Sequence, residues 1–212
     1  MLRRYAELLS SCVTVRLTGT RGADELYERH VLDCLESVPF VPKDGPVIDV
    51  GSGGGLPGVV WAICRPDLDV VLLDSIGKKC RAVRDIISEL GITNVEVICG
   101  RSEDVAKERR ETFSLACARA VASAGITAEL LSPLVRVGGA VMTFKGAKLN
   151  EELEGIKSWK RLGLKEPVIH FYGSDDGEEP SSRSIVLWKK IAPCPRSFPR
   201  KPGSAAVKNW WV

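Results

Sequence analysis

The stretch Val47-Ile48-Asp49-Val50-Gly51-Ser52-Gly53-Gly54-Gly55-Leu56-Pro57-Gly58 decides the fold. A short β-branched run ends beside an acid, a cluster of glycines follows, and an apolar segment of helical character begins directly after them. Glycine suits a turn with positive φ and a backbone that a ligand must approach closely. In open α/β sheets such a turn lies at the carboxyl edge of the strands, where ligands bind. The stretch therefore predicts a strand, a ligand-binding turn and a helix.

Downstream of this turn, short β-branched runs alternate with longer segments of helical period, which is typical of parallel βαβ units. We expect strands at 46–50, 69–74, 94–99, 113–118 and 138–146, and helices at 58–64, 77–90, 103–110, 124–135 and 148–162. Two further strands, at 167–172 and 184–190, are separated by polar residues typical of a long hairpin loop. The expected fold is an α/β open twisted sheet, mostly parallel with an antiparallel C-terminal hairpin, with helices on both faces.

The length of 212 residues and a composition of 44% hydrophobic and 27% charged residues suit a single domain of this kind. Within it we expect a helical extension over 1–44, including a helix at 23–37, a core over 45–191 and a basic tail over 192–212. The apolar runs are far shorter than the roughly 20 residues of a membrane-spanning helix, and the N-terminus lacks the apolar segment of a secretory signal. We therefore expect a cytoplasmic monomer that makes no membrane contact.

Charge is unevenly distributed along the chain. Residues 183–212 hold seven basic side chains and no acidic one, whereas the whole chain carries a formal net charge of +3. A basic segment of this kind suits contact with a polyanion, although a solvated tail is an equal alternative. The seven cysteines are scattered, so we expect neither a disulfide framework nor a metal site. Cys99 and Cys117 lie in apolar runs, where we expect buried thiols.

Three nucleotide-binding motifs compete for the glycine turn. A Walker phosphate loop requires a lysine after the glycines, and none follows here. A dinucleotide fingerprint fits only in a register that starts at Gly53, and a pyrophosphate gains nothing from an acid as close as Asp49. An acid before G-x-G-x-G suits a ligand with an ammonium group and no phosphates, such as the methionine part of S-adenosylmethionine. Asp74, at the end of the next strand, can accept both ribose hydroxyls of either a nicotinamide or an S-adenosylmethionine ligand.

Gly100-Arg101-Ser102-Glu103 follows the third predicted strand. A short side chain and an acid at this place can frame the edge of an adenine. Ser102 can equally cap the next helix, with Glu103 as its first-turn acid. The residues alone leave both interpretations open.

Several segments follow one another in the order typical of one family: ERHVLDCL, IDVGSGGGLPGVVWAICRPD, VVLLDSIGKK, GRSED, ARAVA, FKG and PRKPG. Over about Thr18 to Gly203 the chain resembles the RsmG/GidB family, S-adenosylmethionine-dependent methyltransferases that modify N7 of a guanine in 16S ribosomal RNA. The resemblance implies a class I, Rossmann-like methyltransferase fold with S-adenosyl-L-methionine as the cofactor. It implies 16S rRNA or the small ribosomal subunit as the partner.

The resemblance also assigns site residues, to which the residue argument above adds Asp49. The cofactor-binding residues expected are Asp49, Gly51, Gly53, Gly55, Leu56, Asp74, Ser75, Ile76, Ser102, Glu103 and Arg119. Arg119 and Lys145 are expected at the reacting groups. Residues that match the RNA side of the family are His30, Asp33, Arg101, Lys145 and Gly146, and the basic segment adds Lys189, Lys190, Arg200 and Lys201 as phosphate contacts.

The chemistry implied by the resemblance requires no general base, because guanine N7 has an in-plane lone pair and no proton to lose. The chain shows no Ser/His/Asp or Cys/His arrangement, in agreement with that chemistry. Two alternatives stay open. One is an S-adenosylmethionine-binding RNA or ribosome-assembly protein without catalysis, and the other is a nicotinamide-dependent oxidoreductase that uses Asp74 for the ribose.

Overall fold

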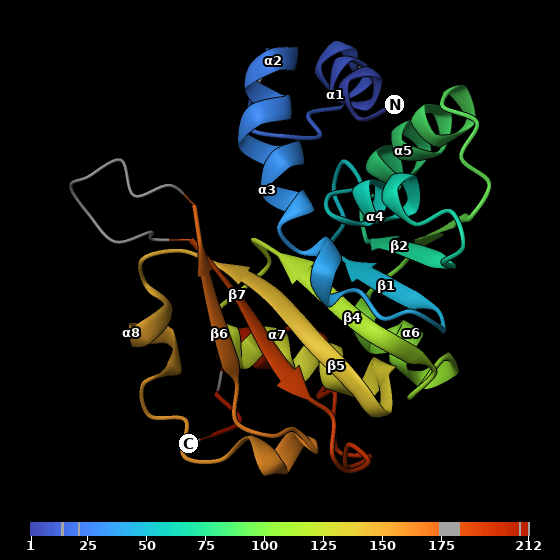
Figure 1. The fold of residues 1–212 in the computed structure, drawn as a ribbon. Helices are drawn as coiled ribbons and strands as arrows, with labels where there is room; N and C mark the ends of the chain where they lie inside the picture. The colour runs from blue at the N-terminus through green and yellow to red at the C-terminus, as the bar shows by residue number, and fades with distance from the viewer. Residues whose placement is uncertain (14, 21, 174–182, 208, 212) are drawn as a thin grey trace. The chain divides into compact units, whose positions relative to one another are not determined.

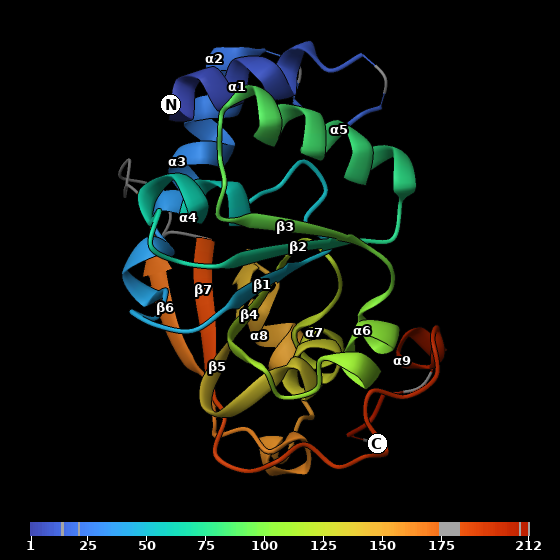
Figure 2. The same cartoon turned by 90° about the vertical axis from the view of Figure 1, so that its right-hand side faces the viewer.

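The structure is a computed structural model that describes residues 1–13, 15–20, 22–173, 183–207 and 209–211. These residues group into two compact units, Met1–Arg101 and Ser102–Val212, whose elements are coloured along the chain in Figures 1 and 2. The hairpin loop predicted between the last two strands lies, over 174–182, outside the described residues. No helix in the described part of the chain is long and apolar enough to cross a membrane.

The first unit contains three parallel strands, which lie side by side in Figure 2. Their order is β3-β2-β1, with β1 at Val47–Val50, β2 at Val70–Asp74 and β3 at Val95–Cys99. Helix α4 (Gly58–Cys64) connects β1 to β2, and α5 (Gly77–Glu89) connects β2 to β3. Every residue of β1 and β2 is buried, as expected for parallel strands covered on both faces. The βαβ units predicted for this part of the chain are confirmed.

Burial decreases at β3, where the sequence prediction for Cys99 is wrong. The side chains of β3 are half-buried or exposed, and the Cys99 thiol is exposed. Apolar neighbours in the sequence suggested a core position, but β3 ends the strand order of this unit and so has a strand neighbour on one side only. The apolar run therefore does not reach the interior.

The helical extension expected over 1–44 contains, besides the helix expected at 23–37, helix α1 (Leu2–Ser11), which packs beside α5 (Figure 2). Its buried face contains Tyr5, Ala6 and Leu9. The Tyr5 hydroxyl donates a hydrogen bond of 2.8 Å to the carbonyl of Gly54. A Cβ atom at Gly54 would lie only 2.9 Å from Leu9, so the side chains of α1 rest directly on the glycine turn.

The helix predicted at 23–37 forms as three consecutive pieces. They are α2 (Ala23–Leu26), a π-helical turn (Tyr27–Val31) and α3 (Leu32–Leu35), followed by a 3-10 turn (Val38–Phe40). The Trp61 indole of α4 donates a hydrogen bond of 2.8 Å to the Ser37 hydroxyl, which itself donates to the Cys34 carbonyl. These two buried hydrogen bonds attach the C-terminal end of α3 to α4.

The second unit contains four strands in the order β4-β5-β7-β6. They are β4 (Phe113–Arg119), β5 (Val135–Lys145), β6 (Val168–Tyr172) and β7 (Arg183–Lys189). The β4–β5 pair is parallel, and the β5–β7 and β6–β7 pairs are antiparallel, which confirms the antiparallel C-terminal strands. The helices are α6 (Ser102–Glu108), α7 (Ala124–Leu131), α8 (Leu149–Leu153) and α9 (Ser204–Val207).

Two helix predictions in this unit are wrong in extent. The helix expected over 148–162 is reduced to α8 and a 3-10 turn at Trp159–Leu162, and Gly155 between them has a φ of 79°, which is incompatible with a continuous helix. The helix expected over 124–135 ends at Leu131, because Pro133 cannot donate the next helical hydrogen bond. Strand β5 consequently begins at Val135, three residues earlier than expected.

The basic tail packs on its own unit. The Trp210 indole donates a hydrogen bond of 2.8 Å to the Gly125 carbonyl, and its ring lies 5.8 Å from that of Trp159, centroid to centroid. The Arg200 guanidinium makes two hydrogen bonds, of 2.7 and 2.6 Å, with the buried carboxylate of Glu129 on α7. These contacts fix the path of the tail across α7.

We expect Tyr5→Phe to lower the free energy of unfolding by about 1–3 kcal/mol, because the buried Gly54 carbonyl loses its donor while the ring stays in place. Urea unfolding followed by tryptophan fluorescence measures the change. Tyr27→Phe is the matched control, since the described residues show no hydrogen bond from the Tyr27 hydroxyl, and it should stay within about 0.5 kcal/mol of the parent. Equal losses in the two variants would contradict this account of Tyr5.

Candidate functional site

The glycine turn predicted from the sequence connects β1 to α4. Gly51 and Gly53 have φ values of 71° and 57°, in the left-handed region that L side chains rarely adopt. The amides of Gly51 and Ser52 both donate to the Leu73 carbonyl, at 2.7 and 3.0 Å, and so attach the turn to the end of β2. Two backbone hydrogen bonds therefore attach the beginning of the turn to β2.

The remaining glycines of the motif serve packing. A Cβ atom at Gly58 would lie 2.2 Å from Leu72, and one at Gly55 would lie 2.5 Å from Val59. At Gly53 the nearest atom to such a Cβ would be 3.7 Å away. Gly58 thus allows α4 to approach β2, and Gly55 leaves room for the Val59 side chain, whereas a Cβ atom at Gly53 would make only ordinary van der Waals contacts with backbone oxygens.

Asp49 lies fully buried beneath this turn. Its Oδ2 accepts a hydrogen bond of 2.9 Å from the amide of Gly58, the first residue of α4. A carboxylate at the start of a helix satisfies an amide that has no partner inside the helix and is favoured by the helix dipole. Asp49 therefore holds the strand, the turn and the helix together and brings a negative charge under the turn.

Asp74, the last residue of β2, is joined to the glycine turn. Its Oδ2 accepts the amide of Gly53 and its Oδ1 accepts the amide of Ile76, each at 2.9 Å. A carboxylate oxygen has two acceptor sites, so one remains on each oxygen. Two adjacent oxygens with one acceptor site each suit a pair of neighbouring hydroxyls, as on a ribose.

The thiol of Cys80, on α5, lies behind this carboxylate and donates to the backbone carbonyl of Asp74 at 3.3 Å. Burial raises the pKa of Cys80 to about 11, with a further contribution from its hydrogen bond with Cys99. The thiol is therefore protonated at neutral pH and remains a donor. The thiol hydrogen-bonds the backbone carbonyl of Asp74, and the side-chain carboxylate of Asp74 hydrogen-bonds the glycine turn.

The first unit fits the expected ligand, S-adenosylmethionine. Gly51 is exposed and Gly53 is half-buried, so the turn can face an amino-acid chain, and the Asp74 oxygens can accept a ribose diol. Because the Gly53 amide donates to Asp74, these two features are parts of one site. Of the other predicted cofactor residues, Ser75 and Ile76 are exposed beside Asp74, whereas Leu56 is buried within the turn.

The second unit holds the other residues predicted at the cofactor and the reacting groups. Ser102 and Glu103 are both buried at the start of α6, where the Ser102 hydroxyl donates to Glu103 Oε2 at 3.2 Å. Arg119 ends β4 with its guanidinium carbon 5.8 Å from the centre of the Phe144 ring. The Lys145 ammonium, at the end of β5, pairs with Glu152 at 2.7 Å and donates to the Ala122 carbonyl.

Parallel pairing places Arg119 opposite Phe144, the residue before Lys145, so both predicted residues lie at the carboxyl edge of the β4–β5 pair. Loops and side chains at this edge commonly carry function in α/β proteins. The Lys145 side chain is only 7% exposed and its ammonium is engaged by Glu152. Arg119, at the same edge, is half-exposed.

The residues predicted on the RNA side differ in accessibility. His30 lies in the π-helical turn, 3.0 Å from the Thr20 hydroxyl, and Asp33 is buried on α3. Arg101 and Lys201 are exposed. Lys189 is also exposed, and its ammonium donates to the Gly138 carbonyl.

The RNA contact predicted for Lys190 is wrong, because its side chain is buried. The ammonium donates to the Ser132 carbonyl at 2.7 Å and lies 3.4 Å from Glu111. Burial lowers the pKa of Lys190, and the neighbouring Glu111 carboxylate raises it again in part. Arg200 is likewise engaged, through its pairing with Glu129. A count of basic residues therefore overestimated the charge that the tail presents to a polyanion.

Sequence reasoning missed the residues that support the glycine turn from α1. Tyr5 and Leu9 contact Gly54, and Leu17 adds a third contact. The signal was present, since Tyr5, Ala6 and Leu9 have the spacing of one helix face.

Comparison with known proteins places this geometry in a family. The model of the GidB family, rRNA small subunit methyltransferase G, matches residues 1–175. Ribosomal RNA small subunit methyltransferase G of Clostridium novyi is 37% identical over 199 residues, 92% of this chain and 81% of that protein. The protein of the same name from Petrotoga mobilis is 37% identical over 209 residues, 95% of this chain and 91% of that protein.

Among solved structures, an rRNA methylase from Streptococcus thermophilus resembles this chain with a TM-score of 0.54 at 16% identity. The match covers 76% of this chain and 95% of that chain, and it bears on the fold alone. The fold and the family expected from the sequence motifs are both confirmed. The chain has the class I, Rossmann-like methyltransferase fold and belongs to the rRNA small subunit methyltransferase G (GidB) family.

Proposed function

We propose that this protein transfers the methyl group of S-adenosyl-L-methionine to N7 of a guanine in 16S ribosomal RNA. The observation that carries the proposal is the hydrogen bond between Gly53 and Asp74, which joins the glycine turn to a carboxylate with an acceptor site left on each oxygen. Membership of the GidB family supports the choice of donor and substrate. Since the substrate is ribosomal RNA, the protein acts in the cytoplasm, and we assign it a monomeric form.

When bound, S-adenosylmethionine supplies an electrophilic methyl carbon on a sulfonium. Asp74 accepts the two ribose hydroxyls at the acceptor site that remains on each oxygen. The turn around Gly51 and Gly53 receives the methionine part, and Asp49 beneath it favours the ammonium group electrostatically. On the family resemblance, Ser102 and Glu103 contact the adenine.

Methyl transfer to N7 needs orientation more than proton transfer, because N7 attacks with a lone pair and loses no proton. Holding two reactants in line contributes up to about 7–11 kcal/mol in favourable cases. Guanine O6 is an acceptor beside N7 on the same edge, and an arginine is its usual partner in proteins. We assign this contact to Arg119, because it is half-exposed at the end of β4 whereas the Lys145 side chain is only 7% exposed.

The whole proposal is tested by incubating the purified protein with methyl-labelled donor and undermethylated small ribosomal subunits. The expected result is one labelled guanine, located by the chemical strand cleavage that N7-methylguanine permits. Binding of RNA and donor without incorporation of label would instead identify a ribosome-assembly protein without catalysis. Binding of NADH in place of the donor would identify the nicotinamide alternative.

We expect Asp74→Asn to weaken binding of S-adenosylhomocysteine at least tenfold. An amide offers a single acceptor oxygen where the carboxylate offers two, and each hydrogen bond to a charged group contributes about 1.5–3 kcal/mol. Isothermal titration measures the affinity. Asp69→Asn removes the same charge from an exposed residue just before β2 and should bind normally. Unchanged affinity in folded Asp74→Asn would remove the basis of the proposed site.

Arg119→Ala should reduce the methyl-transfer rate by about 100-fold or more, because loss of orientation at the reacting groups has effects of that order. The unfolding midpoint should change little, since Arg119 lies half-exposed at the end of β4. Arg136→Ala, at the exposed beginning of β5, is the control for charge and should retain the parent rate. A near-normal rate for Arg119→Ala would show that another residue orients the guanine.

A further inference from the structure

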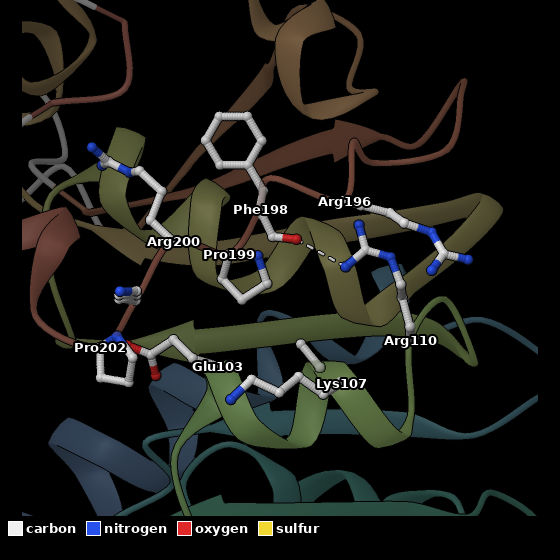
Figure 3. Close-up of a pocket in the computed structure, with 10 residues that line it drawn as sticks. Glu103, Lys107, Arg110, Arg196, Phe198, Pro199, Arg200 and Pro202 are labelled. Carbon is white, nitrogen blue, oxygen red and sulfur yellow. Dashed lines mark hydrogen bonds between the residues drawn. The ribbon is translucent and has the colours of Figure 1, made fainter.

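The second unit contains a cavity of about 520 Å³ between α6 and the tail segment 196–202 (Figure 3). Five of its ten lining residues are cationic and one, Glu103, is acidic. In Figure 3 the guanidinium groups of Arg110 and Arg196 lie on the right of the view, and Glu103 and Pro202 lie on the left. A volume in this range is typical of pockets that hold a small organic ligand or a nucleotide.

Hydrogen bonds of two arginines, most of them part-buried, fix the walls of this cavity. The Arg110 guanidinium donates to the carbonyls of Cys194, Pro195 and Phe198, at 2.6, 2.9 and 2.8 Å. Arg200 is held by Glu129 on α7. Because these bonds already order the tail, a ligand would not have to bear the entropic cost of ordering it.

The cations of the cavity divide into two kinds. Arg110 and Arg200 are engaged in the contacts that build the walls. Arg196 and Lys201 are exposed, and within the described ranges neither side-chain cation has a hydrogen-bond or ion-pair partner. Lys107, on the rim, pairs with the exposed Asp104 at 2.7 Å, a kind of contact that contributes little and exchanges readily. The cavity therefore carries uncompensated positive charge on a preformed surface.

The aromatic residue of the cavity argues against recognition of a base. The Phe198 side chain is only 7% exposed, so its ring offers no face on which a base could stack. Arginine and lysine without an aromatic platform suit a phosphate, whose contacts position RNA without reading its sequence. The cationic lining also disfavours S-adenosylmethionine, which itself carries a sulfonium.

We propose that this cavity binds a backbone phosphate of the RNA substrate through Arg196 and Lys201, with Lys107 at its rim. The inference rests on the proposed function for its choice of RNA. It adds Arg196 and Lys107 to the residues expected from the sequence, and it separates Lys201, a direct contact, from Arg200, which builds the wall.

The test is the salt dependence of binding to a 16S rRNA fragment in the absence of donor. For the double variant Arg196→Ala/Lys201→Ala, the slope of log K against log salt concentration should fall in magnitude by about 0.7–0.9, the value for one phosphate contact. Lys160→Ala/Lys165→Ala removes two exposed charges that do not line the cavity and should leave the slope nearly unchanged. Equal slopes for the two double variants would overturn the proposal.

Two further measurements separate the possible outcomes. Affinity for S-adenosylhomocysteine should be the same in the parent and in both double variants. Failure of the parent to bind this ligand would count against the proposed function. The salt slope would still test the phosphate site, because it is measured without donor. Titration with inorganic phosphate forms the second arm. Phosphate binding that the Arg196→Ala/Lys201→Ala variant loses, without any change in the RNA slope, would show a site for a free anion and would overturn the RNA assignment.

Discussion

The hydrogen bond of 2.9 Å from the Gly53 amide to the Asp74 carboxylate is the interaction on which the candidate site depends. It joins the turn after one strand to the end of the next strand, so the place for an amino-acid chain and the place for a ribose have a fixed relation. The same carboxylate accepts the Ile76 amide, which orients both oxygens. A glycine is needed at the donor position because its φ is 57°, in the left-handed region that L side chains rarely adopt.

Support for this bond comes from two sides of the first unit. Asp49 attaches the far end of the turn to the beginning of α4 through the Gly58 amide. From α1, the Tyr5 hydroxyl donates to the Gly54 carbonyl, and Leu9 packs where a side chain at Gly54 would otherwise lie. Leu17, in the loop after α1, packs at the same place. The N-terminal extension is consequently part of the structure of the site, although none of these α1 residues needs to touch the ligand.

The sequence predicted most of the strands and the turn because both have strong local causes. Parallel strands such as β1 and β2 are buried throughout and therefore read as continuous apolar runs, and a positive φ at Gly51 or Gly53 demands glycine. Tertiary environment decided the rest. Cys99 lies in an apolar run but at the end of the strand order, and Lys190 lies in a basic segment but pairs inside with Ser132 and Glu111. Neither outcome leaves a signal in the local sequence.

The central claim is that the Gly53–Asp74 pair receives the ribose side of S-adenosylmethionine. The most direct measurement is a nuclear magnetic resonance titration of the labelled protein with S-adenosylhomocysteine, following the backbone amides of Gly53 and Ile76, which both donate to the Asp74 carboxylate. The account predicts that these two amide resonances shift together and saturate at the same ligand concentration. Saturable binding that leaves both resonances in place would contradict it.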